Sequence, residues 1–176
     1  MNCLLNKNLL RSDSCGYSLP EVKDIYLANY SDVASTSLGE TTGGCEEITA
    51  ITMVSGKTFY HIEPAKNSVT FTDELVVEDN GNKYRTQTLT FNPTGTYDAC
   101  MHDVLDALSL GRFFCVVKTA DGQYLALGRL TGLEASAATL QGGGDTNGMT
   151  VTLSENVTES AIPLAEAAIT VVTTNP

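Results

Sequence analysis

Residues 119–155 constrain the fold of this chain more than any other stretch. They contain the turn sequence Asp121-Gly122 between two apolar segments, a glycine-rich segment at 141–148, and the alternating sequence MTVTLSE at 149–155. Asp-Gly tolerates the positive φ angles of a two-residue hairpin turn, and strict alternation turns one face of a strand toward a core and the other toward solvent. This stretch therefore predicts consecutive antiparallel strands.

An earlier stretch has the same properties. Val69 and Phe71 alternate with Ser and Thr, Leu89 and Phe91 alternate with Thr, and Asp-Asn-Gly-Asn at 79–82 lies between the two runs. Two half-buried strands joined by such a turn pair antiparallel. We therefore predict a second hairpin, and the apolar residues of VKDIYLANY near the start of the chain predict a first strand.

The apolar period changes after Pro93, where it becomes that of a helix. Apolar residues recur at spacings of three and four, which predicts one amphipathic helix at about 97–110 with Gly111 at its C-terminal end. The stripe consists of Tyr97, Met101, Val104 or Leu105, and Leu108. One helix cannot bury its stripe alone, so we expect it to lie on the sheet.

These patterns predict a mainly β fold with one α-helix, an antiparallel β-sandwich or half-barrel flanked by a single helix. A chain of 176 residues is long enough for one domain of ordinary size. We expect an N-terminal arm at 1–20, the β domain at 21–155 and a C-terminal arm at 156–176. The Ser-, Thr- and Gly-rich segment 31–44 predicts a long exposed loop. ITVVTT at 169–174 is compatible with a strand added late or on a neighbour.

The formal net charge of −11 gives the chain no general attraction to phosphate backbones or anionic lipid. A negative surface keeps a protein soluble, and it could equally form a wall along which DNA slides without binding. The first residues are too broken by polar side chains for a signal peptide and too short for a membrane span, so we expect synthesis in a cytoplasm. The five cysteines form no C-x-x-C pair and are expected to be reduced, with Cys100 and Cys115 in apolar surroundings.

No combination of residues in the sequence indicates catalysis. Gly56-Lys57-Thr58 has only the last part of a phosphate-binding loop, and the glycines at 142–144 lack the spacing of a dinucleotide-binding turn. His61 and His102 fall in different predicted elements, whereas a zinc site needs several converging ligands. We therefore predict no catalytic, cofactor-binding or metal-binding residue, and no enzyme activity.

The order of these elements resembles that of small virion structural proteins of tailed phages that infect gut Bacteroidetes, including the crAss-like group. The resemblance covers roughly residues 20–165 and rests on element order together with the segment from Gly132-Leu133-Glu134 through GGGDTNGMTVTL to Leu153. It implies a tail-tube-like fold whose copies join side by side into a ring around a DNA channel. The C-terminal sequence AIPLAEAAITVVTTNP, at 161–176, runs longer than this pattern.

The resemblance also implies a function and partners. We expect a non-enzymatic virion protein that forms homo-oligomeric rings in a phage tail or neck, contacts other tail or neck proteins, and lets DNA pass without sequence-specific binding. It would be assembled in the host cytoplasm and would not contact membranes. The alternative is a β-sandwich binding module of a phage or bacterial surface that recognises glycans through segments 31–44 and 141–148. An enzyme with a site that the sequence does not reveal is the third hypothesis.

Overall fold

The computed structural model describes residues 21–41, 43–64, 67–93, 99–142 and 148–174. Within these ranges the strands are β1 (Val22–Asn29), β2 (Val33–Glu40), β3 (Glu46–Met53), β4 (Tyr60–Ile62), β5 (Thr70–Val77), β6 (Lys83–Phe91), β7 (Arg112–Thr119), β8 (Tyr124–Leu127), β9 (Leu133–Gln141), β10 (Gly148–Val157) and β11 (Ile162–Pro163). The helices are α1 (Ala99–Leu110), α2 (Glu166–Thr173) and the short 3-10 helix η1 (Tyr30–Asp32).

Antiparallel pairing dominates the molecule, as the alternating sequences predict. One large sheet runs in the order β11-β8-β7-β9-β10-β6-β5. Two further strands branch from this order, because β1 also pairs with β7, and β4 pairs with β1. β2 and β3 form a separate two-stranded sheet. The two predicted hairpins are confirmed as β5–β6 and β7–β8.

Strand β7 lies at the centre because both of its faces are apolar. Phe113, Cys115 and Val117 face a first core, where Leu108 of α1 covers the sheet. Phe114 and Val116 face a second core, which β3 and α2 cover on the opposite side. A strand buried on both faces has a continuous apolar sequence, and this explains the run FFCVV. The result is a layered, sandwich-like β fold.

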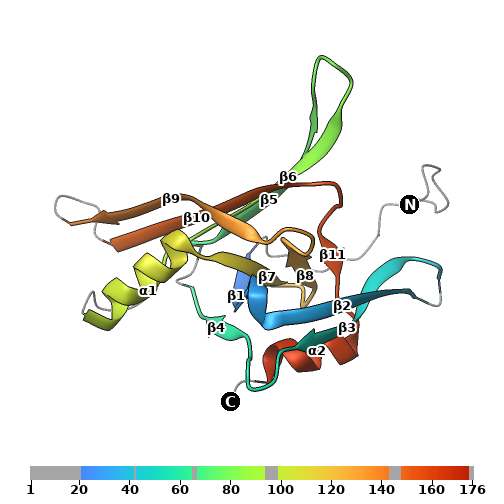
Figure 1. Cartoon of the computed structure of the whole chain (residues 1–176), viewed down its shortest axis with the longest axis horizontal. Helices are drawn as coiled ribbons and strands as arrows, with labels where there is room; N and C mark the ends of the chain where they lie inside the picture. Colours follow the sequence, from blue (N-terminus) through green and yellow to red (C-terminus); the bar gives the residue numbers. More distant parts are fainter. Residues whose placement is uncertain (1–20, 42, 65–66, 94–98, 143–147, 175–176) are drawn as a thin grey trace, which may run out of the picture.

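Three β-hairpins extend away from this body (Figure 1). β5–β6 projects at the top of the view, β9–β10 runs out to the left, and β2–β3 runs out to the right. In the β5–β6 hairpin, pairing continues in register from Thr70–Thr90 out to Val77–Lys83, so the strands stay regular beyond the core. The tip of the β5–β6 hairpin therefore presents a strand surface beyond the body of the same copy.

The single predicted helix was an underestimate, because the C-terminal segment contains α2. Glu-Ala-Ala at 166–168 starts the helix with strong helix formers, and Ala168 and Val172, four residues apart, are both fully buried on one face. The sequence ITVVTT is thus mostly helical and not a strand. Residues 162–173, expected within a C-terminal arm, contribute β11 to the large sheet beside β8 and place α2 against β3.

The prediction of a long loop at 31–44 was also wrong. This segment continues from η1 into β2, which pairs with β3 from Val33–Met53 to Glu40–Glu46. Ser and Thr side chains are tolerated on an exposed strand, so composition alone did not distinguish it from a loop. The expected N-terminal arm at 1–20 lies outside the described residues.

Of two smaller predictions near α1, the one on Cys100 was wrong and the one on Gly111 is confirmed. Cys115 is fully buried as predicted, but Cys100 is exposed on α1. Gly111 follows the helix as predicted, but it does not adopt a positive φ. A Cβ there would lie 2.5 Å from the ring of Phe113 and 2.7 Å from the carbonyl oxygen of Ala107. Glycine is therefore required by close packing and not by the left-handed conformation.

Candidate functional site

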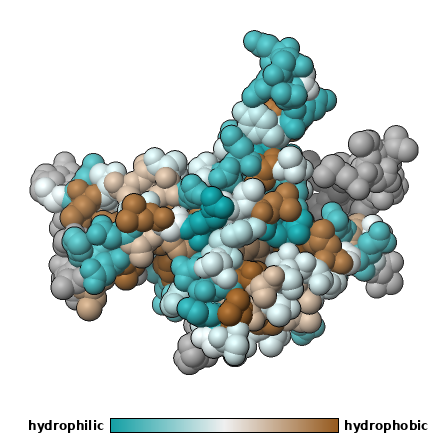
Figure 2. Space-filling view, in the orientation of Figure 1, coloured by the Kyte–Doolittle hydropathy of each residue, from teal (hydrophilic) through white to brown (hydrophobic). Residues whose placement is uncertain are grey.

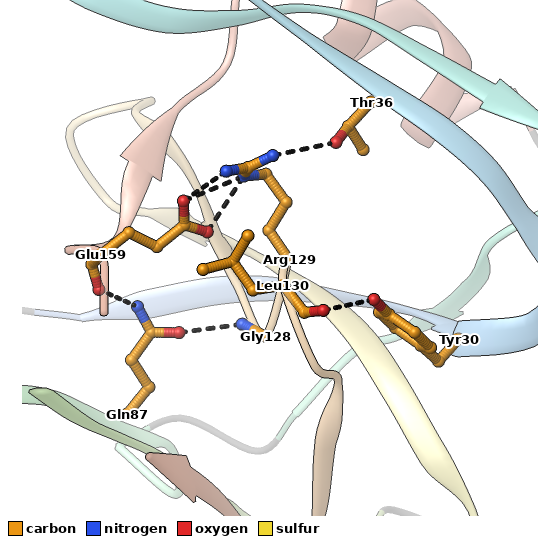
Figure 3. A network of polar contacts seen from close by, with 7 residues as sticks. All are labelled: Tyr30, Thr36, Gln87, Gly128, Arg129, Leu130 and Glu159. Atoms are coloured by element: carbon orange, nitrogen blue, oxygen red, sulfur yellow. Dashed lines mark hydrogen bonds and ion pairs between the residues drawn. The ribbon is translucent and has the colours of Figure 1, made fainter. Parts of the chain in front are cut away.

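A largely buried ion pair lies where the β5–β6 hairpin meets the body (Figure 3). Arg129 Nε lies 2.9 and 3.1 Å from the two carboxylate oxygens of Glu159, and Nη2 also donates to that carboxylate. Nη1 reaches Thr36 Oγ1 of β2 at 3.4 Å. The two charged side chains are only 16% and 13% exposed. The pair therefore connects β2, the loop after β8 and the segment after β10.

Gln87 of β6 extends this network into the core. Its side chain is 1% exposed; Oε1 accepts the Gly128 amide proton at 2.8 Å, and Nε2 donates to the Glu159 carbonyl at 3.3 Å. Tyr30 donates its hydroxyl proton to the Leu130 carbonyl on the other side of the same loop (Figure 3). A buried amide is stable only when its donor and acceptor are both paired, as they are here.

Glycine shapes the loop that carries Arg129. Gly128 and Gly132 have φ angles of +69° and +77°, and the Gly132 amide donates to the Gly128 carbonyl at 2.8 Å. A Cβ on Gly128 would lie 2.8 Å from the backbone nitrogen of Leu133, which cannot move aside easily. Glycine is therefore needed to form the tight turn that directs Arg129 into the network.

A second ion pair anchors the base of the β5–β6 hairpin. Asp73 Oδ1 accepts from Arg85 Nε at 2.7 Å, and Oδ2 accepts the Ala161 amide proton at 2.8 Å. Ala161 lies two residues after Glu159, so the same segment contacts both networks. Together these contacts fix the direction in which the β5–β6 hairpin leaves the body.

The outer half of that hairpin carries exposed aliphatic side chains. Leu75 and Val77 are 58% and 56% exposed, and they lie on the same face because strand residues alternate. Directly opposite them on β6 are Arg85 and Lys83. One face of the hairpin tip thus presents two aliphatic groups flanked by cations.

An apolar groove opens between α1 and the β1–β4 pair. It encloses about 420 Å³ and is lined mainly by apolar side chains. Leu27, Leu108 and Phe113 line its buried part. Ile62 is half-buried, and Tyr60 and Val104 are exposed at the rim. Figure 2 shows separate apolar side chains among polar ones over this face of the molecule, including the left side where α1 and β9–β10 lie. Such a groove suits an aliphatic group and offers little polar chemistry.

A cluster of titratable side chains lies on the other face of the large sheet. Asp24 Oδ1 lies 3.0 Å from His61 Nε2, and Asp24 Oδ2 lies 3.3 Å from Lys118 Nζ. The His61 ring stacks on Tyr26 at 4.7 Å, and Lys118 lies over the ring of Tyr124 at 5.4 Å. These residues come from β1, β4, β7 and β8, so the cluster joins four neighbouring strands.

The electrostatics of this cluster keep Tyr26 and Lys118 protonated. Burial, reinforced by the Asp24 carboxylate, raises the pKa of Tyr26. A hydrogen bond with Tyr124 is the main cause that raises the pKa of Lys118. Both groups therefore keep their protons at neutral pH, whereas a catalytic lysine or tyrosine base needs a lowered pKa. The arrangement is that of a cross-strand contact.

The cluster predicts a loss of stability in alkaline solution. Since the folded-state pKa values of Tyr26 and Lys118 are raised, their stabilising contribution is complete below the unfolded pKa values, near about 10, and is lost as the pH rises through the folded values. We expect the free energy of unfolding, measured in urea, to fall above about pH 10. Tyr26→Phe should flatten that decline, and an identical slope in both proteins would contradict the assignment.

The structure keeps the other candidate groups of the sequence apart. Gly56 lies in the turn after β3, and Lys57 pairs with Asp32 at 3.7 Å. His61 lies on β4 and His102 lies on α1. Burial raises the pKa of the Cys115 thiol. Within the described ranges, no group of three or more His, Cys, Asp or Glu side chains is placed to hold a metal ion. Most of the glycine-rich segment, at 143–147, lies outside those ranges.

Gln87, Arg129 and Glu159 were not singled out in the sequence. Only Gln87 carried a local signal, because it occupies an inward position in the alternating strand that also buries Leu89 and Phe91. A polar side chain at such a position predicts a buried hydrogen-bond network.

Among the residues with described structure, no helix is both long and apolar enough to cross a membrane. Comparison of the chain with models of protein families, with curated proteins and with solved structures gave no match.

Proposed function

We propose that this protein is a non-enzymatic structural subunit that assembles with copies of itself into a ring, in the tail or neck of a phage virion around the DNA channel. The observation that carries the proposal is the β5–β6 hairpin. It projects from the body with Leu75 and Val77 exposed (Figure 1), and at its base Asp73 forms an ion pair with Arg85 and accepts a hydrogen bond from the Ala161 amide. Exposed strands with aliphatic side chains favour contact with another chain.

Identical subunits satisfy such surfaces most simply by meeting one another. A contact between two different surfaces of the same chain repeats from copy to copy, and it closes into a ring when the rotation allows. The net charge of −11 is compatible with a channel through which DNA passes without being held. The proposed partners are therefore sister copies and neighbouring tail or neck proteins.

The glycan-binding alternative relied on two segments, 31–44 and 141–148. The first is largely the regular strand β2, paired along its length with β3, and this leaves less irregular loop for ligand recognition. A glycan array would distinguish the two functions, because a monomer that binds a defined glycan would favour the binding module.

Self-assembly is tested by native mass spectrometry and electron microscopy of the full chain over a concentration series. We expect oligomers of one defined size, with ring-shaped particles, at the upper end of the series, and we expect the protein in purified virions. A protein that stays monomeric throughout and is missing from virions would contradict the proposal. An assembly that depends on concentration would support it, because interfaces between identical subunits follow mass action.

A further inference from the structure

We propose that the tip of the β5–β6 hairpin of one copy docks into the groove between α1 and β4 of the next copy. This inference rests on the proposed self-assembly and names the surfaces that carry it. The occupant of the groove is thus a second copy of this chain. Four features of the molecule support the pairing: the shape of the hairpin, the lining of the groove, the charges around both, and their placement.

The hairpin tip has the form of an apolar projection. Leu75 and Val77 lie on the face that continues from Phe71, which packs on the first core. Beyond the core the same face is open, and both side chains are more than half exposed. Each aliphatic side chain would gain free energy by leaving water, in proportion to the apolar area that it buries.

The groove is the matching apolar surface. Its base belongs to the first core, so Leu108 and Phe113 are already held in place before any partner binds. Tyr60 and Val104, at 60% and 47% exposure, remain available at the rim. A preformed apolar site that needs no rearrangement binds with a smaller entropic cost than a mobile one. The groove therefore suits two aliphatic side chains on a fixed hairpin.

The charges nearest the apolar groups differ in sign: Lys83 lies on the hairpin face that carries Leu75 and Val77, whereas Glu78 and Asp79 lie beyond that face in the turn. The described part of the chain has seven Lys and Arg side chains, and five of them form ion pairs there: Lys57, Arg85, Arg112, Lys118 and Arg129. Lys83, directly opposite Val77 at the hairpin tip, is not among these five. Asp103, next to Val104 at the groove, has a side chain that is 88% exposed. Complementary charge guides the encounter and disfavours the reverse orientation.

The two surfaces lie on different sides of the molecule. In Figure 1 the β5–β6 tip is at the top, while α1 and β4 are at the lower left and bottom. A copy whose hairpin is fixed at its base cannot place its own tip in its own groove. The contact is therefore head-to-tail between copies, and such a contact forms a closed ring or an open filament.

Two variants test this pairing, one for each surface. Leu75→Asp with Val77→Asp removes the projection and keeps the groove, whereas Tyr60→Ser with Val104→Asp changes the groove and keeps the projection. Each variant alone should need more than about tenfold higher concentration to assemble than the wild type. Val54→Asp is the matched control, since Val54 is a 42% exposed aliphatic residue outside both surfaces, and it should assemble normally.

Mixing the two variants gives the sharpest result. Only one intact projection and one intact groove are then left, so an equimolar mixture should form a heterodimer and stop there in native mass spectrometry. Circular dichroism and the thermal midpoint of each variant should match the wild type, which shows that the fold is intact. A mixture that forms full rings, or one that stays monomeric, would overturn the pairing.

The failure of this inference differs from the failure of the proposed function. If the wild type forms rings and either variant assembles equally well, the pairing is wrong and self-assembly stands. If the wild type stays monomeric at every concentration and is missing from virions, the proposed function is wrong and the pairing falls with it.

Discussion

Glu159→Ala is expected to lower the free energy of unfolding by about 3–5 kcal/mol, because it leaves the guanidinium of Arg129 buried without its carboxylate. The Arg129 side chain is only 16% exposed, and Glu159 accepts three of its four hydrogen bonds. The loop on which Arg129 lies is fixed by glycine geometry, so the charge has little freedom to move into water. Urea unfolding at neutral pH measures the loss as a lower midpoint with an unchanged slope.

The control for this prediction replaces both partners. In Arg129→Met with Glu159→Leu no charge is left unpaired, and the double variant should be much more stable than Glu159→Ala. Glu134→Ala removes one partner of the surface ion pair between Glu134 and Arg112. Both of these side chains are about half exposed. Because water solvates the charge that remains, we expect a loss of less than about 1 kcal/mol. An equal loss in Glu159→Ala and Glu134→Ala would show that burial does not govern the Arg129 pair.

The sequence predicted the elements whose signals are local. The alternating residues around Gly81 and the apolar segments around Gly122 predicted the β5–β6 and β7–β8 hairpins, because a tight turn and its two strands lie next to one another in the chain. The 3.6-residue period predicted α1 for the same reason. In both cases one run of residues contains all the information needed.

Two elements were missed for different reasons. β2 pairs with β3, the next strand along the chain, but its Ser- and Thr-rich sequence has no apolar alternation to mark it as a strand. α2 was not distinguished from a strand because Ile, Thr and Val favour strands, whereas burial of Ala168 and Val172 against β3 selects the helix. Local propensity is a weak guide when tertiary packing decides the conformation.

The polar network could not be predicted because its members are far apart in sequence. Arg129 meets Thr36 across 93 residues and Glu159 across 30, while Gln87 meets Gly128 across 41. A single Arg or Glu in a turn is ordinarily solvated, so neither residue carried a signal of burial. Only the order of strands in the folded sheet brings them together. The proposed contact between copies depends on the same order of strands, because this order also places the β5–β6 hairpin that would reach the next copy.

Phe114→Ala is expected to cost about 3–5 kcal/mol, since it opens a cavity in the second core. Phe114 is 1% exposed and meets Phe59 edge-to-face at a ring-centroid distance of 5.8 Å. Its position beneath β3 and α2 means that few neighbouring groups can move in to fill the space. Thermal and urea unfolding measure the loss. Phe71→Ala, at the half-buried edge of the first core, is the control and should cost less.

The same variant separates stability from assembly. Phe114 lies on the face of β7 opposite to Phe113, which lines the groove. A substitution at Phe114 and a substitution in the groove therefore act on different layers of the sheet. In the proposed assembly, and at a temperature where Phe114→Ala is still folded, this variant should form rings of the wild-type subunit number even though its unfolding midpoint is lower. A change of ring size without unfolding would mean that the layer of β3 and α2, and not the groove alone, takes part in the contact between copies.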